Sequence, residues 1–245
     1  SGAFPLLYAG EWAKRMLPGP RAIGAVDAWV PAAIRRVVSM QQENGGFALW
    51  PFSRGVVEDA SLYAVHFLAE AKAAGFDVPA DRLEAALGWV RGELDRAIPA
   101  DADEDKWRAD MQARAYMCHI LALAGRPDAG WNARLREQSA RLNFAARAHA
   151  ASALLLAGEP REAVPLLESL PLPAARPRTP GRLLDSDIRD AALLLSAWLD
   201  VDPENEAVAR LAQYLRDRQQ DGHWGNTQDD AFALLAFGKL ARHLP

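Results

Sequence analysis

Helical periodicity runs along almost the whole chain, and signals for β-strands are nearly absent. Six alanine-rich segments are apolar on most sides, which is typical of buried helices. They are expected near residues 4–17, 59–74, 108–124, 144–157, 187–200 and 229–242. Amphipathic segments alternate with them near residues 29–42, 80–97, 128–140, 160–169 and 204–219. This alternation predicts repeated helical hairpins, each with one buried and one outer helix.

The same pattern of residues ends a helix at two places that are 177 residues apart. Ile34 to Phe47 reads IRRVVSMQQENGGF, and Leu211 to Trp224 reads LAQYLRDRQQDGHW. A glutamine in the last helical turn is followed by a glycine, which can adopt the left-handed conformation, and then by an aromatic residue expected to fold over the helix end. The equivalent pairs are Gln42 and Gln219, Gly45 and Gly222, and Phe47 and Trp224.

A proline-rich stretch bears on domain organisation, and the tryptophans bear on the predicted core. The proline-rich stretch at 170–185 predicts a long surface loop within one domain that spans residues 1–245, since the repeated helix exit occurs on both sides of it. Most of the tryptophans lie at apolar helical positions and are expected in the core, whereas Trp50 and Trp224 should clamp helix ends. The tryptophans expected in the core are Trp12, Trp29, Trp89, Trp107, Trp131 and Trp198.

Charge and hydropathy narrow the range of partners. The net charge is −4 and the pI is near 5.8, which argues against a nucleic acid or an anionic membrane as partner. No stretch approaches the ~18 consecutive apolar residues that cross a bilayer, so no direct membrane insertion is expected. Because the sequence begins Ser-Gly and shows no leader, we expect it to be excised from a larger multidomain protein.

Several collinear motifs resemble the thioester domain of bacterial α2-macroglobulins. They read FPLLYAGEWA, MQQENGGFALWP, ASLYAVHFLAEAKAAGFDVP, QARAYMCHILALAGRP, DSDIRDAALLLSAWLDVDPEN and WGNTQDDAFALLAF, and together they run nearly end to end. The resemblance implies an all-α fold, an α/α toroid like those of terpenoid cyclases and complement thioester domains. About six inner and five to six outer helices would form it. The alternation alone would also fit an open solenoid.

The same resemblance implies a function. Members of the family trap proteases after a bait region is cut, and are periplasmic, lipid-anchored or secreted. Neighbouring β-domains of the parent protein and target proteases are the implied partners, and no cofactor is expected. The family's thioester joins a cysteine to a glutamine three residues later, in a Cys-x-Glu-Gln motif shortly before the helix that corresponds to FPLLY. This motif is absent from the sequence, so a non-catalytic domain is expected.

The remaining nucleophiles and metal ligands give weak signals. Cys118 is followed at the third position by Leu121, and its alanine-rich helix predicts a buried, inert thiol. The five histidines show no metal-ligand spacing, so no metal site is expected. They are His66, His119, His149, His223 and His243.

Seven carboxylates lie at or just before the starts of the predicted buried helices. They are Glu58, Asp59, Asp110, Asp187, Asp190, Asp229 and Asp230. Helix capping and favourable interaction with the helix dipole explain all of them. If the buried helices run in one direction, these acids mark a single face of the domain, on the side of Ser1, where the family's thioester would lie.

An enzyme on the same toroid is the alternative. Terpene cyclases share Gln-x-x-Gly-x-Trp turns, and inverting glycosidases use paired carboxylates. The cyclase acid motif Asp-x-Asp-Asp is matched best at Asp185-Ser186-Asp187-Ile188, which fails at the fourth position. A protein prenyltransferase would need a zinc set of Asp, Cys and His. A cyclase would enclose a deep aromatic cavity, whereas a thioester-type domain is expected to fill its axis with alanine, leucine and valine.

Overall fold

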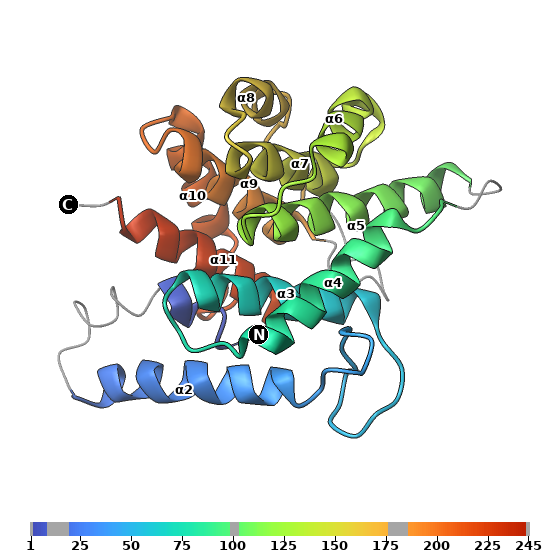
Figure 1. Ribbon diagram of the computed structural model, residues 1–245. Coiled ribbons are helices and arrows are strands. Elements are labelled where there is room, and N and C mark those ends of the chain that lie inside the picture. Colours follow the sequence, from blue (N-terminus) through green and yellow to red (C-terminus); the bar gives the residue numbers. More distant parts are fainter. Residues whose placement is uncertain (1, 9–19, 99–102, 176–185, 244–245) are drawn as a thin grey trace. The chain divides into compact units, whose positions relative to one another are not determined.

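The computed structural model describes residues 2–8, 20–98, 103–175 and 186–243, and within these the chain is helical (Figure 1). The described part of the chain has no β-strand, although two isolated bridges join Gln41 to Phe47 and Gln220 to His223. The α-helices are α2 Pro20–Val38, α3 Glu58–Ala73, α4 Ala80–Asp95, α5 Glu104–Leu123, α6 Ala129–Glu137, α7 Phe144–Leu156, α8 Pro160–Glu168, α9 Asp187–Val201, α10 Glu206–Asp217 and α11 Thr227–Ala241, with a 3₁₀ turn at Ser139–Arg141.

Most helices begin and end close to the predicted positions, and the all-α class is confirmed. The prediction for α2 was wrong, because the helix begins at Pro20 and carries Pro31 in its interior. Proline removes one helical hydrogen bond, but the alanine-rich stretch before it still favours helix. Helix α5 begins four residues earlier than predicted, where Asp103 caps it by accepting from the backbone N–H of Lys106. The predicted helix at 4–17 lies largely outside the described residues.

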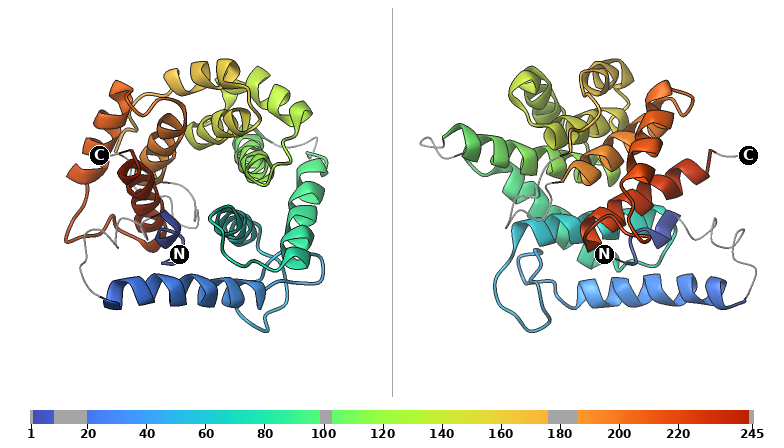
Figure 2. Two further views of the ribbon diagram at one scale, coloured as in Figure 1. Left: turned by 60° about the vertical axis from the view of Figure 1, so that its left-hand side comes forward. Right: turned by 180° about the vertical axis from the view of Figure 1, so that it is seen from behind.

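By its internal contacts, the described chain divides into two compact units, residues 1–31 with 167–245 and residues 32–166. The prediction of one domain over residues 1–245 is not tested by this division. In the unit of residues 32–166, α3, α5 and α7 pack side by side in one layer, and α4 and α6 pack against them in a second layer (Figure 2). Buried residues are most numerous in α3, α5 and α7, so these are the apolar helices that the sequence predicts.

In the unit of residues 1–31 and 167–245, α9 packs against both α11 and α10. Helix α10 is amphipathic and turns Val208, Leu211 and Leu215 inward. The N-terminal segment lies against α11, where the rings of Phe4 and Phe232 are 6.5 Å apart. These contacts repeat the pairing of buried and amphipathic helices seen in the other unit.

Three buried helices end in the same way. Gly75, Gly125 and Gly158 follow α3, α5 and α7 with φ between +74° and +86°. In each case the residue after the glycine donates its N–H to a carbonyl near the end of the helix, as Arg126 does to Leu121 at 2.8 Å. This left-handed closure requires glycine and satisfies carbonyls that would otherwise lack partners. Gly238, by contrast, lies inside α11 and closes no helix.

The two repeated turns share the predicted glycine geometry. Gly45 has φ +91° and Gly222 has φ +85°. Trp224 is buried, and its indole Nε1–H donates to the Leu215 carbonyl at 2.7 Å near the end of α10, so it closes that helix as expected. Both glutamines lie beyond their helices rather than in the last turn, because α2 ends at Val38 and α10 ends at Asp217.

Two tryptophan predictions were wrong. Trp50 does not clamp a helix end, since 67% of it is exposed, and Trp29 on α2 is 63% exposed. Trp89, Trp198 and Trp224 are buried as expected. Apolar spacing identified a helical face in the case of Trp29, but spacing alone does not show whether another element covers that face.

Candidate functional site

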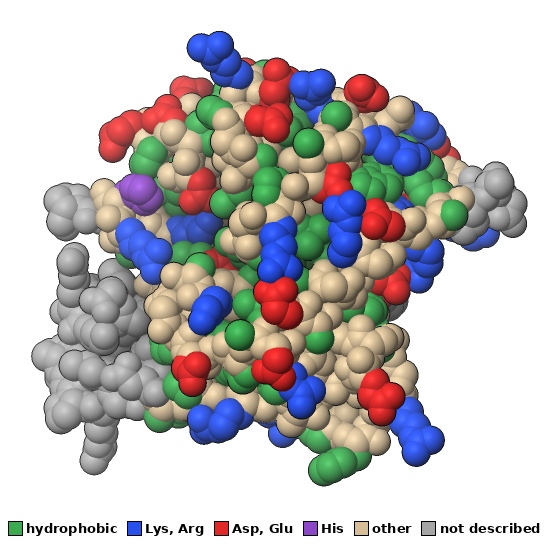
Figure 3. Space-filling view, viewed as in Figure 1, with side chains coloured by type: hydrophobic (Ala, Val, Ile, Leu, Met, Phe, Trp, Pro, Cys, Tyr) green, Lys and Arg blue, Asp and Glu red, His purple; other side chains and the backbone are tan. Residues whose placement is uncertain are grey.

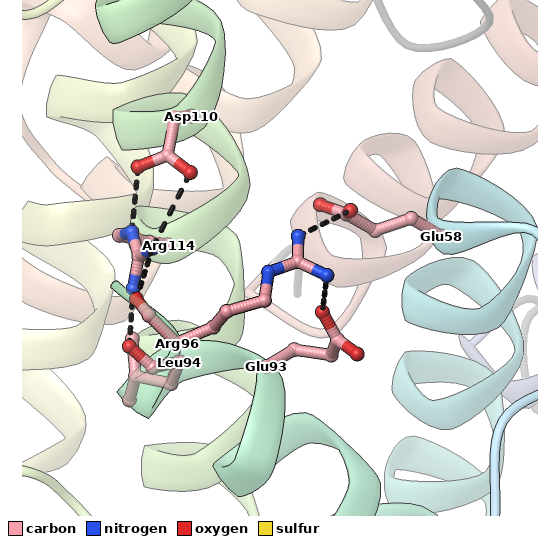
Figure 4. A network of polar contacts seen from close by, with 6 residues as sticks. All are labelled: Glu58, Glu93, Leu94, Arg96, Asp110 and Arg114. Carbon is pink, nitrogen blue, oxygen red and sulfur yellow. Dashed lines mark hydrogen bonds and ion pairs between the residues drawn. The ribbon is translucent and has the colours of Figure 1, made fainter. Parts of the chain in front are cut away.

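Three of the seven predicted acids, Glu58, Asp59 and Asp110, lie in the unit of residues 32–166, and Glu58 and Asp110 belong to the polar network of Figure 4. Glu58 begins α3 and lies 3.6 Å from Arg96, the residue that follows α4. The other guanidinium nitrogen of Arg96 contacts Glu93 on α4 at 2.6 Å. Asp59 and Asp110 act on Glu58 through their charges. The start of α3 therefore meets the end of α4, so these two helices run in opposite directions.

Arg114 on α5 carries the second half of the network. Its side chain is 2% exposed, and its Nε donates to Asp110 at 2.6 Å, four residues earlier on the same helix. Its Nη1 donates to the Leu94 carbonyl, and its Nη2 donates to the Arg96 carbonyl at 2.7 Å. Arg114 thus satisfies carbonyls at the end of α4 and joins that end to α5. Asp110 lies in the second turn of α5 rather than at its start, because α5 begins at Glu104.

The environment of Glu58 disfavours its charge. Burial raises the pKa of Glu58 above its usual 4.5. Arg96 acts in the opposite direction, while Glu93, Asp59 and Asp110 raise the pKa further by repulsion. Because the pKa is higher in the folded chain than in the unfolded chain, ionised Glu58 costs stability above the unfolded pKa, and this cost disappears at lower pH.

We expect Glu58→Gln to raise the free energy of unfolding at pH 7 by a few tenths of a kcal/mol, since Glu58 is partly exposed and its interactions are screened. The difference should vanish well below pH 4.5, where Glu58 is protonated in both states. Urea unfolding at the two pH values measures the effect, with Asp59→Asn as a control for removing any charge from this turn. A Glu58→Gln variant that is less stable than the parent chain at pH 7 would contradict the assignment.

The other four predicted acids lie in the first turns of α9 and α11, in the unit of residues 1–31 and 167–245. Asp187 accepts from the Tyr214 hydroxyl at 2.8 Å and lies 3.6 Å from Arg218 beyond α10. Asp229 accepts from the Ser186 hydroxyl at 2.5 Å, which brings the starts of α9 and α11 together. Within that unit, the starts of the two helices therefore share an end.

The remaining two acids have structural surroundings. Asp230 accepts the backbone N–H of Trp224 at 2.7 Å and thereby holds the repeated turn against α11. Asp190 is buried on α9. The acids were expected to cap helices or to interact with the helix dipole. The capping side chains are other residues, because six of the acids lie inside first turns and Asp110 lies in the second turn of α5. The side-chain caps are Asp103, Asp128, Asn143, Ser186, Asn205 and Asn226. A single face that combines both sets of acids stays a prediction.

Three of the histidines that are scattered in the sequence meet in space. His66 on α3, His119 on α5 and His149 on α7 surround Tyr116, with ring centroids 4.5–6.4 Å apart. The His66 Nδ1 and the Tyr116 hydroxyl share a hydrogen bond at 2.9 Å, and His66 Nε2 lies 3.5 Å from Glu70. No group of three histidine, cysteine or carboxylate residues in the described part of the chain is arranged to hold a metal ion. The sequence missed this cluster because its members come from different helices.

Cys118 lies on α5 and is fully buried, as the sequence predicts. Burial raises the pKa of its thiol to about 12, with a further contribution from the charge of Asp128. The thiolate is the reactive form, so both access and ionisation limit its chemistry.

We expect Cys118 to react with an aromatic disulfide reagent at pH 8 at least ~10³-fold more slowly in the folded chain than in urea. Methylamine, which opens internal thioesters, should change neither the mass nor the thiol content of the chain. Thiol titration and mass spectrometry measure both outcomes, and Cys118→Ala supplies the background rate. A fast native reaction would contradict the assignment of Cys118 as an inert thiol.

A half-open pocket of about 290 Å³ lies among α8, α9, α10 and the chain after α8. Leucines dominate its apolar part, and Trp198 is the single aromatic residue in its lining. Glu206 and Arg210 supply charged groups to it. The lining contrasts with the aromatic cavity that a terpene cyclase requires.

None of the described helices is long and apolar enough to cross a membrane.

Comparison with known proteins shows which proteins this chain is similar to. No protein-family model matches the chain. A curated protein from Xylella fastidiosa (strain Temecula1) is 29% identical over 217 residues, which are 84% of this chain and 13% of that protein, and its name is Alpha-2-macroglobulin. The relatives are bacterial α2-macroglobulins. The chain spans about an eighth of the length of this curated relative.

Solved α2-macroglobulins have the same fold over nearly the whole chain. Salmonella α2-macroglobulin reacted with methylamine matches 97% of the chain and 16% of its own, with a TM-score of 0.79 and 23% identity. Escherichia coli α2-macroglobulin activated by porcine elastase matches 100% of the chain and 22% of its own, with a TM-score of 0.77 and 24% identity. Native Escherichia coli α2-macroglobulin from domain MG7 to the C-terminus matches 100% of the chain and 39% of its own, with a TM-score of 0.76 and 21% identity. These structures show that the chain has the fold of the corresponding part of the solved α2-macroglobulins, and the likeness is consistent with an all-α toroid.

Proposed function

We propose that this chain is a non-catalytic, thioester-type domain of a bacterial α2-macroglobulin-like protein, and that the parent protein inhibits a broad range of endopeptidases by trapping them. The match to the Salmonella α2-macroglobulin over 97% of the chain is the observation that carries the proposal. The sequence match to the Xylella protein supports it independently. The neighbouring β-domains of the parent and its target proteases are the proposed partners, and the periplasm is the proposed location.

The chemistry of the described residues supports a non-catalytic role. Several of the seven predicted acids are engaged in hydrogen bonds that join helix ends, as Asp187 is with Tyr214 and Asp229 is with Ser186. Cys118 is buried, has a raised pKa and has Leu121 where a thioester would need glutamine. The described pocket in the unit of residues 1–31 and 167–245 has Trp198 as its single aromatic residue. The alternative of a cyclase, prenyltransferase or glycosidase is not favoured.

Protease trapping has a measurable signature. The polypeptide encoded by the full reading frame around this chain would be mixed with elastase or trypsin, and the cleavage of casein and of a small chromogenic peptide would be compared. We expect cleavage of casein to fall while cleavage of the small peptide continues, because a trapped protease keeps its active site. The 245-residue chain alone is the control and should inhibit neither reaction. Equal loss of both activities, or no loss, would contradict the proposal.

A further inference from the structure

The loop between α2 and α3 presents three apolar side chains to solvent. Leu49 is 49% exposed, Trp50 is 67% exposed and Phe52 is 103% exposed. Figure 3 shows hydrophobic atoms projecting at the lower edge of the molecule, where this loop lies. Single exposed apolar residues are ordinary, but three within four positions concentrate exposed apolar side chains in one short segment. We call residues 49–52 the apolar tip.

The base of this loop is firmly held. The Val57 N–H donates to the Phe47 carbonyl at 3.0 Å and closes the loop. The Phe47 N–H donates to the Ser61 hydroxyl of α3 at 2.8 Å, and the Phe47 ring is buried. At the tip, the Ser53 N–H donates to the Trp50 carbonyl at 3.1 Å. The apolar tip is therefore carried on an ordered scaffold, which lowers the entropy cost of binding.

The backbone of the tip is strained at its most exposed residue. Phe52 has φ +66°, a left-handed conformation that is rare for an aromatic residue and costs free energy. The Phe52 side chain gains no burial in the chain that offsets this cost. Strained residues of this kind concentrate at binding sites, because contacts made with a partner compensate for them.

The size of the tip indicates what kind of partner covers it. Trp50 and Phe52 can each bury about 150–250 Å². With Leu49, they fall short of the ~800 Å² per partner that a stable complex between separate proteins needs. A small contact is sufficient, however, when both surfaces belong to one polypeptide, because the effective concentration is then on the order of millimolar. The solved relatives hold this fold within chains of which it makes up 16–39%.

We propose that the apolar tip docks into an apolar recess of a neighbouring domain of the same polypeptide, an inference that rests on the proposed membership of a larger α2-macroglobulin-like protein. Trp50 is the central anchor, in keeping with the large contribution of tryptophan to binding. The surroundings of the tip do not favour a membrane. Arg54 is the only charged residue between Phe47 and Val57, and Glu58 follows directly, whereas attraction to anionic lipids needs several basic residues.

Hydrogen exchange of the amides in residues 48–57 tests this proposal. It would be measured in the 245-residue chain and in the polypeptide encoded by the full reading frame. We expect exchange to be at least about ten-fold slower in the longer polypeptide, since docking removes the loop from solvent. Trp50→Ser combined with Phe52→Asn should abolish that slowing. The paired substitutions affect exposed side chains, and asparagine tolerates the left-handed backbone at position 52.

A matched control removes an exposed apolar residue elsewhere. Leu234→Ser on α11 should leave the slowing unchanged, since Leu234 is exposed but far along the chain from the tip. Equal exchange of residues 48–57 in both polypeptides would overturn the proposal. So would protection that depends on protein concentration, which would indicate a second copy, or protection that appears only with anionic vesicles. A reading frame that holds nothing beyond this chain would overturn it as well.

The hydrogen-exchange experiment and the protease-trapping experiment can fail independently of each other. A longer polypeptide that traps protease while residues 48–57 stay exposed overturns docking alone. One that protects these residues without trapping protease overturns the proposed function of the parent and leaves docking in place.

Discussion

Replacing Gly45 by alanine should destabilise the chain by about 3–5 kcal/mol. Two effects add at this position. The backbone has φ +91°, which costs a non-glycine residue roughly 1–2 kcal/mol. In addition, a Cβ at Gly45 would lie 2.1 Å from the Ala85 carbonyl oxygen on α4, and a backbone atom cannot move aside without shifting the helix. The free energy of unfolding in urea, followed by circular dichroism, measures the loss.

Gly75 provides a matched control in the same unit. Its φ of +86° is close to that of Gly45, but a Cβ there would meet nothing within 4 Å. Gly75→Ala should therefore cost only the backbone term, about 1–2 kcal/mol. Gly222, with φ +85° and open space, should behave like Gly75. Equal losses at Gly45 and Gly75 would show that the close approach of the first repeated turn to α4 contributes nothing to stability.

Arg114→Ala is expected to cost about 2–4 kcal/mol, because it leaves two backbone carbonyls and one carboxylate without their donor. Those acceptors are Leu94, Arg96 and Asp110. The guanidinium also lies 4.8 Å from the centre of the Trp131 ring. Urea unfolding measures the loss, and Arg114→Lys should recover only part of it, since one ammonium cannot reproduce the fork of a guanidinium.

Arg134→Ala separates these hydrogen bonds from the aromatic contact. Arg134 lies 4.7 Å from the same Trp131 ring but is exposed, so its loss should cost less than about 1 kcal/mol. If Arg114→Ala and Arg134→Ala had similar effects, the joining of α4 to α5 by Arg114 would not be an important source of stability.

The sequence predicted the helices better than it predicted their surroundings. Hydrophobic periodicity and the glycines of the two repeated turns, Gly45 and Gly222, are local signals, because a helical face and a left-handed closure each depend on neighbouring residues. The segment predicted near residues 29–42 begins beside Pro31, and proline is favoured at a helix start, yet the helix that contains Pro31 continues on both sides of it. A preference for one position does not exclude another when the flanking residues favour helix.

The polar interior could not be predicted for a different reason. His66, His119 and His149 share no spacing that relates them, and they meet because α3, α5 and α7 lie side by side. Nothing in the sequence around Arg114 distinguishes it from an exposed arginine. It is a buried donor because the end of α4 lies against it. Contacts between distant helices depend on register and orientation, which periodicity does not determine.

The burial of Cys118 has a practical consequence. The sequence contains no other cysteine, so a surface cysteine introduced by mutation would be the only rapidly alkylated group. A fluorophore attached at Ser53, which lies on the exposed loop, would report on that loop without removal of the native thiol. The chain can thus be labelled at a chosen surface position without replacing its native cysteine. Energy-transfer distances could then be recorded on a protein that is altered only at the labelled position.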